Sequence, residues 1–191
     1  MENNNISTIQ ADEIIRLLEE PTDDRRPLKH KLQRSASVKE LVKALTLSQV
    51  ELTRRILCDI LAARKVKSAI PALLECLDDP SPWVKDDAAE ALGKIGSIKA
   101  GEPLLNHFNN DRSLWLAVAL GAIGYRPAIP SLIASLSSPY GKIRGGAAWA
   151  LGELRATEAI TSLELALSKE DDKYALDRIR EALDRIIGKG Q

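Results

Sequence analysis

The feature that most constrains this chain is a repeated pair of short sequence stretches. Residues 69–77 (AIPALLECL) return as residues 128–136 (AIPSLIASL) and, less closely, as residues 159–167 (AITSLELAL). A polar break and a second stretch follow, and here residues 88–95 (AAEALGKI) match residues 147–154 (AAWALGEL). Self-similarity at a spacing of about 30 residues indicates a repeat architecture, in which each unit buries its apolar faces by stacking on its neighbours.

Each repeat predicts two helices. In the first stretch, Ile70, Leu73 and Leu77 recur at the spacing of one helical face. Pro71 suits a first helical turn, because an N–H group there would have no partner in the helix. The polar break at residues 78–82 (DDPSP) then separates this helix from a second apolar stripe. The pattern predicts five helical hairpins, at residues 37–67, 68–98, 99–126, 127–157 and 158–188.

Three of the second stretches carry a glycine in the middle of the predicted helix: Gly93, Gly121 and Gly152. A glycine inside a helix costs about 1 kcal/mol relative to alanine, so we expect neighbouring helices to cross closely at these positions. The first and last hairpins have Leu61 and Asp184 in this column. Divergent terminal units are expected in a repeat array, because their outer faces contact water.

The composition supports an all-α fold. Apolar residues make up 45% of the chain, but aromatic residues only 4%. An interior built mainly from Leu, Ile, Val and Ala favours closely packed helices over a sheet sandwich. We therefore predict one domain, in which residues 37–188 form an α-α solenoid and residues 1–36 form a separate leading segment.

The leading segment differs from the repeats. Ile14, Leu17 and Leu18 predict a short helix that ends near Glu20, and a basic stretch follows at residues 25–34. Two interpretations remain open. The basic stretch is either a solvated linker or cap on the first hairpin, or a docking arm for an acidic partner.

The repeat also resembles a known family. The pattern A-I-P-x-L-L-x-x-L, then D-P-x-x-x-V-K/R, then A-A-x-A-L-G-x-I-G resembles the short HEAT-like repeats named for phycobilisome lyases. Residues 69–96 carry it almost in full, and residues 128–154 nearly so. The resemblance implies a right-handed α-α superhelix whose second helices line a concave groove. The basic residue of the pattern is present as Lys85 and Arg144, whereas the last hairpin has Leu176 there.

Aligning the hairpins predicts which side chains of the second helices face this groove. The middle of the row is apolar and aromatic and its edges are charged, which is typical of a protein-binding patch. The predicted partner-binding residues are Arg54, Arg55, Asp86, Asp87, Glu90, Leu114, Trp115, Val118, Trp149, Arg178 and Glu181. Gly145 and Gly146 are expected to leave Trp149 unscreened, and Trp83 is expected in an inter-helix loop. In the alternative interpretation, Trp115 and Trp149 fill gaps between adjacent repeats.

The sequence has no recognisable catalytic or metal-binding motif. His30 and His107 lack further ligands at metal-binding spacing, and Cys58 and Cys76 are expected to be buried free thiols. Lys plus Arg and Asp plus Glu both total 27, so no surplus of positive charge favours nucleic acid. No apolar run approaches the roughly 20 residues of a membrane span, and the start of the chain is unlike a signal peptide. We therefore expect a cytoplasmic protein without membrane insertion.

Three functions are compatible with the predicted repeat fold. We favour a non-catalytic scaffold or adaptor that holds a partner protein in the groove without a cofactor. The family resemblance implies an alternative, a bilin lyase component or a phycobilisome assembly or degradation factor. Such a protein would bind a phycobiliprotein or a second HEAT-like subunit, and would hold a bilin transiently beside Asp86, Asp87 or Glu90. The third, suggested by a resemblance to HEAT-like DNA glycosylases, is disfavoured by the zero net charge.

Overall fold

The computed structural model describes residues 9–188, and these form α-helices and short 3-10 turns without any β-strand. The predicted all-α fold is therefore confirmed. The chain divides into two compact units, Met1–Ile95 and Gly96–Gln191. The boundary falls after Ile95, between the second and the third of the predicted hairpins. In a repeat array each hairpin contacts only its neighbours, so a boundary between compact units can fall between two hairpins.

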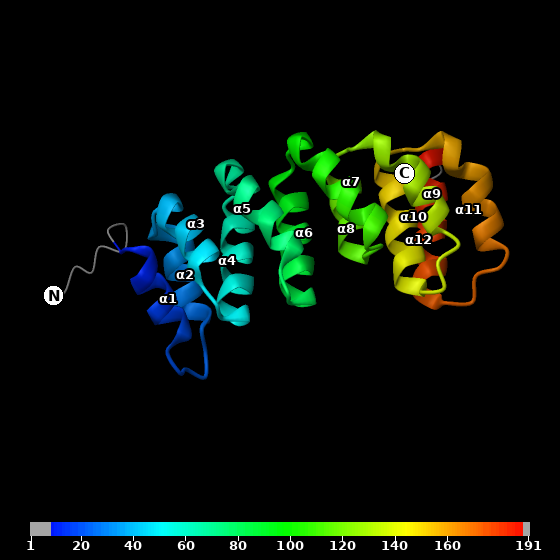
Figure 1. Ribbon diagram of the computed structural model, residues 1–191. Coiled ribbons are helices and arrows are strands. Elements are labelled where there is room, and N and C mark those ends of the chain that lie inside the picture. Colours follow the sequence, from blue (N-terminus) through cyan, green and yellow to red (C-terminus); the bar gives the residue numbers. More distant parts are fainter. Residues whose placement is uncertain (1–8, 189–191) are drawn as a thin grey trace. The chain divides into compact units, whose positions relative to one another are not determined.

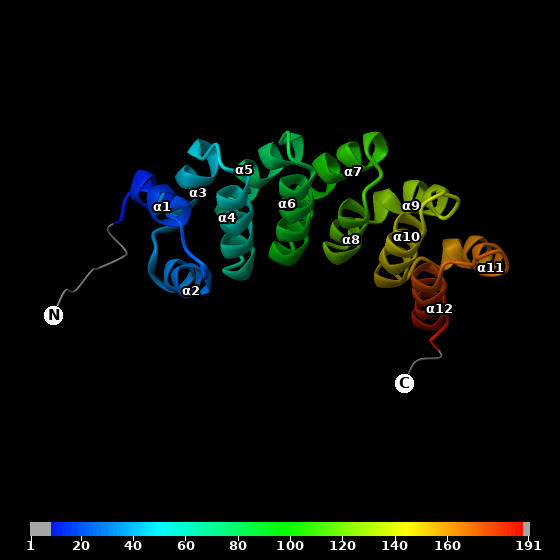
Figure 2. The same cartoon turned by 90° about the horizontal axis from the view of Figure 1, so that it is seen from below.

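Unit 1 is a stack of three helical hairpins (Figure 1). Its helices are α1 (Ala11–Glu19), α2 (Arg26–Ser35), α3 (Val38–Leu47), α4 (Glu51–Ala63), α5 (Ile70–Glu75) and α6 (Pro82–Ile95). Short 3-10 turns at Lys67–Ala69 and Cys76–Asp78 flank α5. The first helices α1, α3 and α5 form one layer, and the second helices α2, α4 and α6 form the other (Figure 2).

Unit 2 is built in the same way from three further hairpins. Its helices are α7 (Gly101–Asn110), α8 (Leu114–Ala122), α9 (Ile129–Ser135), α10 (Gly141–Glu153), α11 (Ile160–Leu167) and α12 (Lys173–Ile187). A 3-10 turn precedes each first helix, at Ile98–Ala100, Arg126–Ala128 and Thr157–Ala159. The second helices α8, α10 and α12 lie side by side, with α10 in the middle (Figure 2). The five predicted hairpins correspond to α3–α4, α5–α6, α7–α8, α9–α10 and α11–α12.

The basic stretch of the leading segment forms helix α2, which packs on α4. Leu32 on its inner side is buried, and Lys29 forms an ion pair with Asp59 of α4. Together with α1, which packs on α3, it makes an additional hairpin at the start of unit 1. The segment is therefore a helical cap on the first predicted hairpin rather than a solvated linker.

Each of the five predicted hairpins has a left-handed backbone conformation just after its second helix. Gly96, Gly124 and Gly188 have φ of 71°, 73° and 80°, and Lys65 and Arg155 have φ of 50° and 46° at the corresponding places. A residue with positive φ reverses the chain direction at a helix end, and glycine adopts this conformation without a steric penalty. The same local stop signal thus ends the second helix of all five predicted hairpins, and in the first four it is followed by the turn that leads into the next first helix.

The predicted close helix crossings are present in unit 2. A Cβ atom added to Gly121 of α8 would lie 2.7 Å from Ala150 Cα of α10. One added to Gly152 of α10 would lie 3.0 Å from Ala182 Cα of α12. At Gly121 a larger residue would therefore require a helix to move, and at Gly152 the neighbouring helix would have to shift by a few tenths of an ångström.

Candidate functional site

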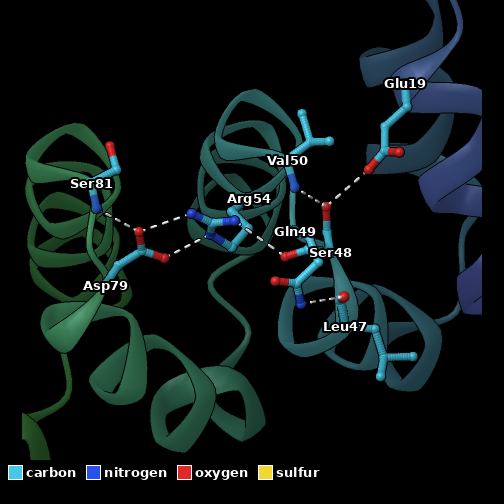
Figure 3. Close-up of polar contacts among 8 residues, drawn as sticks. All are labelled: Glu19, Leu47, Ser48, Gln49, Val50, Arg54, Asp79 and Ser81. Atoms are coloured by element: carbon cyan, nitrogen blue, oxygen red, sulfur yellow. Dashed lines mark hydrogen bonds and ion pairs between the residues drawn. The ribbon is translucent and has the colours of Figure 1, made fainter.

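In unit 1 a partly buried arginine joins the loops of neighbouring hairpins (Figure 3). The guanidinium group of Arg54 donates to both carboxylate oxygens of Asp79, with distances of 2.6 and 2.9 Å, and to the Ser48 carbonyl oxygen at 3.2 Å. The Asp79 carboxylate also accepts a bond of 2.8 Å from the Ser81 backbone N–H, just before α6. Glu19 of α1 accepts a bond of 3.1 Å from the Ser48 hydroxyl. These contacts tie together the inter-helix loops of unit 1.

Unit 2 contains the same arrangement, which we call the loop clamp in both units. Arg144 of α10 donates to both carboxylate oxygens of Glu170, at 2.7 and 2.5 Å, and to the Ser138 carbonyl oxygen at 2.9 Å. Glu170 in turn accepts a bond of 2.9 Å from the Asp172 backbone N–H. Bidentate pairs of this kind fix geometry as well as adding energy.

The acid of each loop clamp is held in its ionised form. Burial of Asp79 would by itself raise its pKa, but hydrogen bonds from Arg54 and the Ser81 N–H lower the pKa below the usual range. Hydrogen bonding to Arg144 lowers the pKa of Glu170 by more than burial raises it. Both carboxylates are therefore charged at neutral pH and engaged in holding loops. We assign the clamps a structural role.

The first hairpin needs a register correction of one residue. A shift of 31 residues takes the buried set of α4 (Thr53, Leu57, Cys58, Ile60, Leu61 and Ala62) onto that of α6 (Val84, Ala88, Ala89, Ala91, Leu92 and Gly93). Ala62, not Leu61, therefore occupies the glycine column. Arg54 corresponds to Lys85, and its side chain lies in the loop clamp with only 12% of its surface exposed. The counterparts of Asp86, Asp87 and Glu90 are Arg55, Ile56 and Asp59.

We call the outward side of α4 and α6 the second-helix face of unit 1. It contains a cleft of about 350 Å³ between α2, α4 and α6. The cleft is lined by Lys29, Leu52, Arg55, Ile56, Asp59, Ala62, Asp87, Glu90, Ala91 and Lys94. Its charges are paired across or along the helices: Arg55 with Asp87 at 2.7 Å, Glu90 with Lys94 at 3.0 Å, and Lys29 with Asp59. Asp86 is half-buried on the same helix.

Trp83 is the most exposed of the three tryptophans. It lies in the first turn of α6 rather than in the predicted loop, and 61% of its surface is exposed. The guanidinium carbon of Arg55 lies 5.6 Å from the centre of its ring, close enough for a cation–π contact. The sequence pattern missed this helical position because Pro82, taken as part of the break, is the first residue of α6.

The corresponding face of unit 2 is apolar where that of unit 1 is charged. Leu114, Trp115 and Val118 on α8 are half-buried, as is Trp149 on α10. A Cβ atom added to Gly121 would lie 3.2 Å from Cζ3 of Trp149, so this ring leans against α8. Three of the four predicted residues thus lie on one helix, and the fourth reaches toward it. We call this group the apolar stripe.

Gly145 and Gly146 are covered, in contrast to the expected open glycines. A Cβ atom at Gly145 would lie 2.5 Å from Cε1 of Tyr174, and one at Gly146 would lie 2.5 Å from Cδ1 of Leu114. These glycines therefore make room for side chains of the neighbouring second helices. Next to Tyr174, the guanidinium carbon of Arg178 lies 5.6 Å from the ring centre. Arg178 also pairs with Glu181 at 2.9 Å.

The two cysteines are free and buried, as predicted. They also lie next to each other, a contact between α4 and the turn after α5 that their sequence separation does not reveal. The Cys58 thiol hydrogen-bonds to Cys76, which raises the pKa of Cys58, and burial raises it further. The same hydrogen bond lowers the pKa of Cys76.

The described residues contain no group of three or more His, Cys, Asp or Glu side chains placed to hold a metal ion. Within residues 9–188, no helix combines the length and apolar character needed to cross a membrane.

The repeats match a known family, described as HEAT repeats, over residues 38–117 and again over residues 104–184. No curated protein matches the sequence. In structure, the chain resembles a chain from the complex of CpcE and CpcF of phycocyanin lyase from Nostoc sp. PCC7120. The TM-score is 0.60 at 20% identity, and the alignment covers 97% of this chain and 98% of that chain.

A designed armadillo repeat protein aligns with a TM-score of 0.61 at 18% identity, over 93% of this chain and 100% of that chain. An engineered protein aligns with a TM-score of 0.55 at 22% identity, over 94% and 97% of the two chains. At such identities the structural similarities show a shared helical-repeat fold. Because the family match extends over more than half of its residues, this chain belongs to the HEAT-repeat family.

Proposed function

We propose that this HEAT-repeat protein is a non-catalytic scaffold that binds a partner protein on the apolar stripe of unit 2. The observation that carries the proposal is the stripe itself: Trp115, Val118 and Trp149 are partly exposed on neighbouring second helices. Tryptophan is enriched among the residues that dominate binding energy, and a charged border is typical of binding patches. Arg178 and Glu181 of α12, already paired with each other, supply such charges.

The test compares tryptophans inside and outside the stripe. The wild-type protein is first used to capture partners from the source cell. The affinity of each captured partner is then measured for the wild type and for the variants Trp115→Ala, Trp149→Ala and Trp83→Ala. Each stripe variant should weaken binding by about 2 kcal/mol, or roughly thirtyfold, with unchanged helix content by circular dichroism. Trp83→Ala is the matched control, because Trp83 lies in unit 1, and it should bind like the parent. Stripe variants that bind normally, or that unfold, would contradict the proposal.

A second candidate rests on the likeness to a chain of the phycocyanin lyase complex along almost the whole length of both chains. In this alternative the chain acts as a bilin lyase component or as a phycobilisome assembly or degradation factor. Its partner is a phycobiliprotein or a second HEAT-like subunit. In the cleft of unit 1, the carboxylates of Asp87 and Glu90 would then exchange their ion pairs with Arg55 and Lys94 for hydrogen bonds from pyrrole N–H groups. Adding a phycobilin to the protein should then change its visible absorbance, and Asp87→Asn with Glu90→Gln should remove that change. An unchanged spectrum would exclude bilin binding by the isolated chain.

A further inference from the structure

Helix α2 carries charge of a single sign. Between Arg26 and Ser35 it contains Arg26, Lys29, Lys31 and Arg34, and no acidic residue. The neighbouring α3 adds two lysines, and its one acid, Glu40, is buried and accepts a hydrogen bond of 2.9 Å from the Ala11 backbone N–H. The basic side chains of residues 25–43 are Arg25, Arg26, Lys29, Lys31, Arg34, Lys39 and Lys43.

Three of these seven cations are used inside unit 1. Arg25 donates to the carbonyl oxygens of Leu18 and Glu20, Arg26 pairs with Asp24, and Lys29 pairs with Asp59. The other four are exposed, and within residues 9–188 their side chains form no ion pair or hydrogen bond. These four, Lys31, Arg34, Lys39 and Lys43, lie on α2 and α3, which follow each other in the chain with a two-residue connection, and we call them the basic patch.

This arrangement is unfavourable for the helices that carry it. Lys31 and Arg34 are three residues apart, and Lys39 and Lys43 are four apart, so like charges face each other on each helix. At the start of α2 the Asp24 carboxylate accepts a hydrogen bond of 2.9 Å from the Arg26 backbone N–H and interacts favourably with the helix dipole, so the unfavourable electrostatics are confined to these like-charged pairs. A sequence that departs from local electrostatic preference in this way is expected at a functional site.

Solubility alone does not require one sign of charge, as the helix at the other end of the chain shows. Helix α12 combines four basic residues with the acids Asp177, Glu181 and Asp184. A helix side that contacts water needs polar side chains, and a mixture of charges provides them. The need for a polar surface therefore does not explain why α2 lacks acidic residues.

We propose that the basic patch docks a short acidic segment of another protein. Charge complementarity selects the acidic partner, and the surroundings select a short protein segment over a nucleic acid. Helix α1, which packs on α3, and the loop after it carry Asp12, Glu13, Glu19, Glu20, Asp23 and Asp24. Because α1 packs on α3, a long phosphate backbone or an anionic membrane that extended from α3 onto α1 would be repelled by these carboxylates, whereas a short peptide need not extend that far.

The test uses a short fluorescent oligoglutamate peptide and the full chain. Lys31→Glu with Arg34→Glu should weaken peptide binding about tenfold or more, and wild-type affinity should fall as salt rises. The matched control is Lys67→Glu with Lys99→Glu, which changes net charge equally at exposed lysines of two 3-10 turns, and it should bind within about twofold of wild type.

Equal losses in both double variants, or no measurable binding by the wild type, would overturn the proposal. So would tighter binding of a single-stranded RNA or of phosphatidylserine vesicles to the same patch than of the peptide. The apolar stripe is not involved in these measurements, so they are independent of the proposed scaffold function.

Discussion

The two units place different chemistry at equivalent positions of the same helical framework. In unit 1, Asp59 and Glu90 occupy the position that Val118 and Trp149 occupy in unit 2. The second helices of unit 1 are joined by side-chain ion pairs, such as that of Arg55 with Asp87. Those of unit 2 approach closely at glycines. The two units share the loop clamps and the helix ends, and we infer that these features define the hairpin stack. The residues of the second-helix face differ between the units, so the stack does not depend on their chemistry.

The largest effect is expected at the feature that the units share, the loop clamp. Arg144→Ala leaves the Glu170 carboxylate, which is only 2% exposed, without its partner. Removing one member of a buried pair costs about 3–5 kcal/mol, so urea denaturation should show a loss of that order. Arg54→Ala should behave alike in unit 1, where the side chain of Asp79 is 8% exposed.

A double variant separates the charge from the geometry of the clamp. In Arg144→Met with Glu170→Leu, no buried charge is left alone, and most of the lost stability should return. If Arg144→Ala melts like the parent, or if only one of the two clamps matters, the clamp is not the shared element of the two units.

The second-largest effect is expected at the close helix crossings of unit 2. Gly152→Leu inserts a side chain where even a Cβ atom would lie 3.0 Å from Ala182 Cα, and should lower the free energy of unfolding by about 1–3 kcal/mol. Gly121→Leu, with a closest approach of 2.7 Å, should cost more. Thermal melting with circular dichroism measures both.

The matching control lies in unit 1, where Ala62 of α4 already carries a side chain in the glycine column. Ala62→Gly should not stabilise the protein but cost about 1 kcal/mol, because glycine weakens a helix interior. A gain in stability would mean that Ala62 is strained, and that the two units do not differ in this respect.

The fold was predictable because the repeated apolar and glycine positions carry the helical period and the spacing of hairpins together. Two details were not. The first hairpin has no glycine to fix its register, so Leu61 was assigned the place of Ala62 and Arg54 was assigned to the groove. Pro82 was interpreted as part of a break, although proline is also favoured in a first helical turn, and Trp83 was placed in a loop.

The candidate site depends on contacts between hairpins, which a single sequence reveals poorly. The neighbouring thiols of Cys58 and Cys76 gave no sequence signal that we can identify. The loop clamps do have a sequence signal, because an acidic residue follows Arg54 after 25 residues and Arg144 after 26 residues. The side chains covering Gly145 and Gly146 come from Tyr174 and Leu114 of neighbouring helices, and only their packing shows why the glycines are there.

The smallest effect is expected at the ion pairs that distinguish the face of unit 1. The side chains of Arg55 and Asp87 are 36% and 28% exposed, so water and salt screen their attraction. Asp87→Asn should therefore change the free energy of unfolding by at most about 1 kcal/mol, and by less in high salt. A partner that binds near this face should instead show slower association with Asp87→Lys, because border charges act mainly on encounter rates. Urea denaturation at two salt concentrations and stopped-flow binding measure the two effects separately. If Asp87→Asn lowered the free energy of unfolding by several kcal/mol, the ion pairs would stabilise the fold as much as the loop clamps do. The residues on the second-helix face of unit 1 would then be required for the fold.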